Sequence, residues 1–189
     1  MKRLRWYDYL LKGVDDGLGR EKPVKIFVMG KNGGNVTQIT DGYGARWSPD
    51  GKQLVFCRQT EGRGAGGSIW TVNADGTGVT KVIEDNSQIL QVAWFPDGKS
   101  IVFSSEREQQ GRSALFRVKP DGTALEIVAV HKQWSLFFPV PSPNGLQIVA
   151  DAHPSKGSGE ASVILLDLVS HHASVLAHGV HPSVLWEKP

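Results

Sequence analysis

Histidine is the residue type whose spacing most suggests chemistry in this sequence. Four of the six histidines fall close together near the end of the chain: His171, His172, His178 and His181. Imidazole nitrogens bind divalent metals when several of them converge on one point. Neighbouring strand residues point to opposite faces of a sheet, and neither a cysteine partner nor an HExxH pattern is present. We therefore interpret the four as structural or solvated loop residues and expect no metal; a metal site is the alternative.

Aromatic residues offer a second candidate, a binding surface. Seven of them recur at equivalent positions of a sequence repeat, which predicts that they pack between sheets: Trp47 with Trp94, Phe56 with Phe103, and Phe27 with Trp70 and Phe116. Trp134, Phe137 and Phe138 break that regularity within the segment HKQWSLFFPV. We therefore predict that any aromatic patch that contacts a ligand consists of these three residues. The alternative is that their side chains are buried in the core.

Catalytic patterns are missing from the sequence. The glycine-rich stretches 30–35 and 62–67 match neither a phosphate-binding loop nor a dinucleotide fingerprint, because neither precedes a helical pattern. A Gly-x-Ser-x-Gly elbow is also missing. The regularly placed carboxylates each precede a glycine, which is typical of turns: Asp50, Asp75, Asp97 and Asp121. We therefore expect no catalytic residue and no cofactor.

Composition narrows the class of protein. The 189 residues are 40% hydrophobic and 21% charged, as in a globular chain, and the net charge of +2 is too balanced to indicate nucleic-acid binding. Apolar runs stay well below the roughly 20 residues of a membrane span. The N-terminal MKRLRWYDYLLKGVDDG lacks the features of a signal peptide, so the default expectation is a cytoplasmic protein. The lone Cys57 in LVFCR is expected to be a buried strand thiol.

One hairpin pattern recurs at an interval of 47 residues. It reads WSPDGKQLVF from Trp47, WFPDGKSIVF from Trp94 and PSPNGLQIVA from Pro141. Proline presets its own φ, Asp or Asn tolerates the next turn position, and glycine takes the conformation that side chains resist. Three copies at one spacing predict the same strand–turn–strand unit three times.

A second hairpin pattern alternates with the first. Its copies are short apolar runs around an Asn-Gly or Asp-Gly turn, rich in the β-branched and aromatic residues that strands favour: 25–40, 68–83, 114–129 and 162–177. The fourth copy carries His171 and His172 in the turn region, so it is interpreted as having lost the turn chemistry.

Two hairpins per repeat give four antiparallel strands, which is the signature of a β-propeller blade. The predicted fold class is therefore all-β, a β-propeller of four-stranded antiparallel blades with about three complete blades and a partial or terminus-shared fourth. We expect one propeller domain, or part of one, over 1–189, with residues 1–24 of uncertain structure. The repeat units are placed at 25–40 (a half blade), 43–85, 89–131, 136–178 and 181–189 (a last strand).

The ends of the chain leave two interpretations open. In one, the chain is a fragment or open arc of a larger propeller, which would be expected to self-associate or to need a partner. In the other, VLWEK near the C-terminus and LRWYDYLL near the N-terminus join the half blade and close a four-bladed ring. Such closure would remove exposed strand edges.

The patterns W-S-P-D-G-K-x-(apolar)-V-F and I-W-x-(apolar)-x-x-D-G-T resemble the TolB-type propeller repeat, over roughly residues 25–186. Similar repeats occur in prolyl-oligopeptidase-like and tricorn-like proteases. The resemblance implies a non-catalytic scaffold that binds a protein or peptide, and a periplasmic location for a processed or truncated chain. The alternatives are the propeller part of a hydrolase, or a metal-dependent propeller lyase acting on acidic sugars.

Overall fold

The computed structural model describes residues 25–28, 37–59, 66–87, 89, 91–107, 111–155 and 159–179. The chain divides into two compact units, Met1–Tyr43 and Gly44–Pro189. In the first unit, β1 (Lys25–Val28) pairs antiparallel with β2 (Thr37–Asp41), with a bulge between Ile26 and Phe27. Among the residues that the structure describes, no helix has the length and apolar composition needed to cross a membrane.

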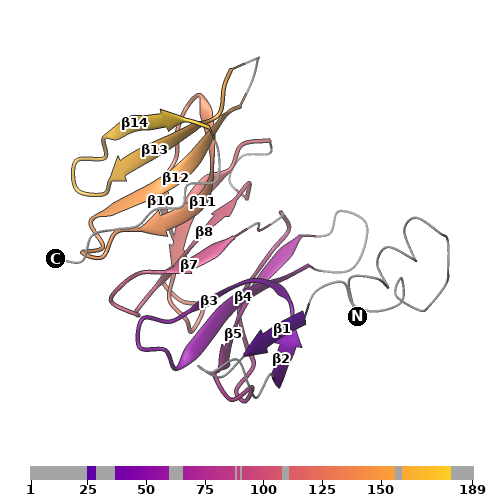
Figure 1. Cartoon of the computed structure of the whole chain (residues 1–189). Helices are drawn as coiled ribbons and strands as arrows, with labels where there is room; N and C mark the ends of the chain where they lie inside the picture. Colours follow the sequence, from indigo (N-terminus) through magenta and orange to yellow (C-terminus); the bar gives the residue numbers. More distant parts are fainter. Residues whose placement is uncertain are drawn as a thin grey trace, which may run out of the picture. The chain divides into compact units, whose positions relative to one another are not determined.

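Three four-stranded antiparallel sheets make up most of the second unit, and the strands of each sheet pair in chain order (Figure 1). The first sheet holds β3 (Tyr43–Trp47), β4 (Gln53–Gln59), β5 (Gly67–Asn73) and β6 (Thr80–Asp85). The second holds β7 (Val92–Trp94), β8 (Ile101–Ser105), β9 (Ala114–Val118) and β10 (Glu126–Ala129). The third holds β11 (Trp134–Pro141), β12 (Gln147–Pro154), β13 (Ser162–Asp167) and β14 (Ala173–His178). The predicted all-β fold of four-stranded blades is confirmed.

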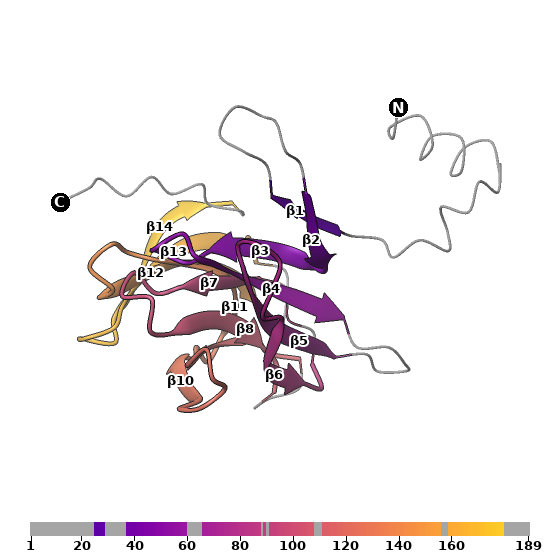
Figure 2. The same cartoon turned by 90° about the horizontal axis from the view of Figure 1, so that it is seen from below.

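The turn between the first and second strands of each four-stranded sheet, called the inner turn below, has the conformation that its sequence predicts. The amide of Gly51 donates to the Ser48 carbonyl, and Gly98 and Gly145 bond in the same way to the residues three before them. All three glycines have φ close to +70° (71°, 67° and 70°). Side chains resist this left-handed conformation, so glycine is required at the position. Figure 2 shows β3 and β4 joined by the first of these turns.

The turns between the third and fourth strands, called the outer turns, are stabilised by aspartate side chains. Asp75 accepts hydrogen bonds from the Thr77 hydroxyl and amide, and these bonds lower the pKa of Asp75 below its usual range. In the third sheet Asp167 performs the same task by accepting from the Ser170 amide and hydroxyl. His171, at φ +56°, takes the left-handed position there. The interpretation that this copy had lost its turn chemistry is therefore wrong, because different residues supply it.

Apolar side chains between the sheets form the core. One cluster joins Phe95, Val102 and Leu115 of the second sheet to third-sheet residues that include Leu136 and Ile164. Phe103 stacks on Phe116 with ring centroids 5.6 Å apart, and both rings are buried. The predicted core packing therefore holds for these repeat positions.

Two aromatics expected in the core are instead about half exposed: Trp47 at 48% and Phe27 at 46%. Trp94, the repeat equivalent of Trp47, is only 8% exposed because it lies against the inner turn of the preceding sheet.

Polar and backbone contacts also connect the first two sheets. Asp85, at the end of β6, is 5% exposed and accepts a 2.6 Å hydrogen bond from the Ser105 hydroxyl of β8. Gly122, in the turn before β10, lies against the Val82 backbone so closely that a β-carbon would clash with the carbonyl oxygen. The first two sheets are thus joined by contacts between β6 and two parts of the second sheet, β8 and the turn before β10.

Cys57 is fully buried in β4, as its sequence context predicted. Burial raises the pKa of the Cys57 thiol from its ordinary 9.0 to about 12, and the charge of Arg46 opposes this shift only partly. The unfolded chain therefore loses this proton before the folded chain does. We predict that the Cys57 contribution to stability is intact below pH 9 and falls by about 1.4 kcal/mol per pH unit between about pH 9 and 12.

Urea unfolding at several pH values checks this prediction against Cys57→Ala. Other groups titrate in the same range, so the quantity to measure is the slope of the unfolding free energy against pH, compared between the two proteins. Equal slopes would contradict an un-ionised thiol in the folded state.

Candidate functional site

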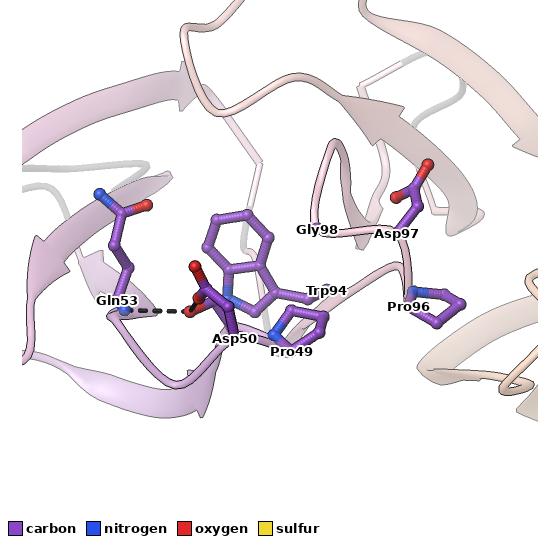
Figure 3. Close-up of a pocket in the computed structure, with 8 residues that line it drawn as sticks. Pro49, Asp50, Gln53, Trp94, Pro96, Asp97 and Gly98 are labelled. Atoms are coloured by element: carbon purple, nitrogen blue, oxygen red, sulfur yellow. Dashed lines mark hydrogen bonds between the residues drawn. The ribbon is translucent and has the colours of Figure 1, made fainter.

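An open pocket of about 400 Å³ lies between the inner turns of the first two four-stranded sheets (Figure 3). The turn 48–51 joins β3 to β4 and forms one wall. The turn 95–98 joins β7 to β8 and forms the other. The repeat places these turns side by side, because equivalent hairpins occupy equivalent positions in adjacent sheets.

One carboxylate stands on each wall. Asp50 Oδ1 accepts hydrogen bonds from the Ser48 hydroxyl at 2.7 Å and from the Lys52 amide at 3.1 Å. The Ser48 hydroxyl, the Lys52 amide and the Lys52 charge hold the pKa of Asp50 below its ordinary value. Asp97 Oδ1 accepts from the Lys99 amide at 2.9 Å. Because each turn uses Oδ1, the Oδ2 atoms of the two aspartates accept no hydrogen bond from the described residues.

The back of the pocket is formed by Trp94, whose indole lies between the two turns (Figure 3). Its Nε1 is buried and has no hydrogen-bond partner among the described residues. Pro49 and Pro96 add rigid apolar surface. The arrangement combines acidic acceptors with apolar walls, which suits recognition better than bond-making chemistry.

The predicted aromatic surface divides between two faces of the third sheet. Trp134 packs against the core cluster and stacks on His131, with ring centroids 4.4 Å apart. Phe137, three residues later, meets the His153 ring edge-on at 5.3 Å. Phe138 has φ +51° within a bulge of β11. Since alternate strand residues face opposite ways, Trp134 and Phe137 do not form one continuous patch.

The histidine candidates are also separated. His171 and His172 are exposed before the start of β14, whereas His178 ends that strand and lies 3.3 Å from the Ser162 hydroxyl. Six strand residues span about 20 Å, too far for the two groups to share one ion. His181 lies outside the described residues. Within the described part of the chain, no group of three or more histidine, cysteine or acidic residues could hold a metal.

Sequence reasoning missed the pocket because it assigned Asp50 and Asp97 to turns alone. A turn uses one oxygen of each carboxylate and gives no role to the other. The sequence feature that could have predicted the pocket is the 47-residue interval, which brings successive turns together, combined with a tryptophan directly before the second turn.

A model of the TolB β-propeller domain family matches residues 43–184. This chain belongs to that family. Among solved structures, a putative TolB from Agrobacterium tumefaciens is similar at 23% identity and TM-score 0.69, over 82% of this chain and 56% of that one. TolB from Acinetobacter baumannii is similar at 19% identity and TM-score 0.66, over 82% of this chain and 38% of that one.

An oligogalacturonate lyase, solved in complex with manganese, is similar to this TolB-family chain at 16% identity and TM-score 0.59, over 84% of this chain and 51% of that one. The chain spans about half the length of these proteins or less. Likenesses at this level of identity show the fold alone. The curated proteins contain no match to the sequence.

Proposed function

We propose that this TolB-family chain is a non-catalytic β-propeller scaffold that binds a protein or peptide partner. The binding surface is formed by the segments 58–68, 105–114, 130–139 and 152–162. Each joins the second strand of a sheet to the third, or leads from one sheet to the next. In an antiparallel meander the strand ends that these segments connect all lie on one side of the sheets, so the described residues of the segments together offer a single surface.

The observation that carries the proposal is the aromatic arrangement within the segment 130–139 of the third sheet. Phe137 is half-buried and held against His153, while Phe138 keeps a backbone conformation that bulky residues rarely adopt. Strain of this kind costs about 1–3 kcal/mol and is concentrated at functional sites. Half-buried aromatic rings on a rigid strand are the usual anchors of a protein interface.

A phage-displayed library of random peptides, panned against the full chain, tests the proposal. We expect enrichment of peptides whose affinity falls by at least tenfold in Phe137→Ala, because loss of an aromatic anchor typically costs about 2 kcal/mol. Val175→Ala, on the exposed face of β14, is the control and should leave affinity unchanged. Melting temperatures of both variants establish that they fold.

Two outcomes would overturn the proposal. One is the absence of any enriched peptide that depends on Phe137. The other is turnover of a peptide or polyuronide substrate by the isolated chain, measured with and without divalent metal. Turnover would favour a hydrolase or lyase instead of a scaffold.

A further inference from the structure

Adjacent inner turns of this chain meet through a glycine and a proline. A β-carbon on Gly98 would lie 3.8 Å from Pro49, and a β-carbon on Gly145 would lie 3.4 Å from Pro96. In both cases the glycine of one turn faces the proline of the turn in the preceding sheet. The equivalent glycine of the first sheet is Gly51, and nothing lies within 4 Å of the position of its β-carbon. This side of the first inner turn is therefore open.

Trp47 faces the same open side. Its repeat equivalent in the second sheet, Trp94, lines the pocket together with Gly98 and is 8% exposed, because its indole lies against the turn 48–51 (Figure 3). Trp47 is 48% exposed. Tryptophan is among the residue types most enriched at the centre of protein interfaces. The packing of Trp94 indicates what would cover Trp47, namely an inner turn that resembles 48–51.

The inner turn of the third sheet resembles 48–51 in sequence and in hydrogen bonding. Residues 48–53 and 142–147 both read Ser-Pro, then Asp or Asn, then Gly, one variable residue and Gln. In each, the serine hydroxyl donates to the Asp or Asn side chain at 2.7 Å, and the glutamine amide donates to the serine oxygen at 2.9 or 3.0 Å. Pro143 and Asn144 are exposed. The third sheet thus presents an accessible copy of the surface on which Trp94 packs.

Two exposed apolar side chains extend this surface. Leu146 is 50% exposed and Val169 is 71% exposed. The Leu168 amide donates to the Leu146 carbonyl at 2.9 Å, so the two side chains belong to adjoining turns. The equivalent positions of the first two sheets carry charged residues, which are Lys52 and Lys99 for Leu146, and Asp75 and Asp121 for Val169. Exposed apolar residues at positions that are otherwise charged indicate a surface that binds another protein.

We propose that this surface binds a second copy of the chain, whose Trp47 packs against the turn 142–147 beside Leu146. The contact repeats between two chains the one that Trp94 makes within a chain. It cannot form within one chain, because the second sheet lies between the first and the third. On β8, Val102 packs on the third sheet and Ser105 bonds to the first, and strand residues an odd number apart face opposite ways.

The proposed contact is head-to-tail, since the two copies contribute different surfaces. One copy provides the open side of its first sheet and the other provides the inner turn of its third sheet. The loop surface proposed above takes no part in this contact, so the two proposals are independent.

Sedimentation velocity of the full chain at increasing concentrations tests the proposal. We expect reversible self-association that weakens by roughly tenfold or more in Trp47→Ala, because tryptophan anchors are among the costliest residues to remove from an interface. Leu146→Lys should weaken it to a similar extent. Its turn should fold normally, because lysine occupies the equivalent position in the other two sheets. Leu176→Lys is the matched control, since it replaces a leucine that is 55% exposed on β14 and should leave self-association unchanged.

Mixing the two weakened variants tests the head-to-tail direction. Trp47→Ala keeps an intact turn 142–147, and Leu146→Lys keeps an intact Trp47, so the mixture should form a heterodimer although neither variant associates strongly alone. A wild-type chain that stays monomeric, a Trp47→Ala variant that associates as strongly as wild type, or a mixture that stays monomeric would overturn the proposal. Phe137→Ala should self-associate normally, so failure here is distinguishable from failure of the loop surface.

Discussion

Replacing Leu136 with alanine should lower the free energy of unfolding by about 3 kcal/mol. Leu136 is fully buried and packs against residues of the second sheet, among them Val102 and Leu115. Its removal exchanges apolar contact for a cavity, and Leu→Ala changes at such sites cost about 2–5 kcal/mol. Urea unfolding followed by tryptophan fluorescence measures the loss.

Leu176→Ala is the matched control for this substitution. Leu176 also lies in a strand of the third sheet but is 55% exposed, so its replacement should change stability by less than about 0.5 kcal/mol. A loss as small for Leu136 as for Leu176 would show that the second and third sheets do not pack on each other in solution.

Asp85→Ala should be nearly as damaging, at about 3 kcal/mol. The carboxylate accepts hydrogen bonds from the Ser87 amide and hydroxyl and from the Ser105 hydroxyl, and Arg107 Nε lies 3.7 Å away. Bonds to a charged group contribute about 1.5–3 kcal/mol, and removing their acceptor leaves buried donors without a partner. Chemical unfolding again provides the measurement.

A double-mutant cycle with Ser105→Ala isolates the contact between the sheets. We expect a coupling of at least about 1 kcal/mol between the two positions, because their oxygens share a 2.6 Å hydrogen bond. Asp75→Ala removes an exposed turn aspartate and should cost far less. Additive effects at Asp85 and Ser105 would mean that the hydrogen bond does not hold the two sheets together.

The strands and inner turns could be predicted from the sequence because their causes are local. Pro-Asp-Gly and Pro-Asn-Gly dictate the backbone of each inner turn whatever surrounds it, and alternating apolar residues dictate the strands. The hairpin 162–177 was predicted, but not the residues that hold its turn, because the aspartate, Asp167, stands several residues before the unfavourable His171. Only the fold shows that the two belong to one turn.

The pocket and the exposure of Trp47 could not be predicted, because both depend on what lies beside a residue in the neighbouring sheet. Trp47 and Trp94 occupy the same repeat position, yet one is exposed and the other buried. Likewise, the turn motif explains why Asp50 is an aspartate but not what its second oxygen faces.

Pairing in chain order has a consequence for folding. In each four-stranded sheet every strand pairs only with its nearest neighbours in the sequence, so contacts within a sheet close short loops. Such local topology favours fast folding, and each sheet can form as soon as its own segment leaves the ribosome. Until the next segment emerges, the apolar face that carries Val102 and Leu115 has no cover. During the interval between successive sheets this uncovered apolar face is the surface most open to association with other chains.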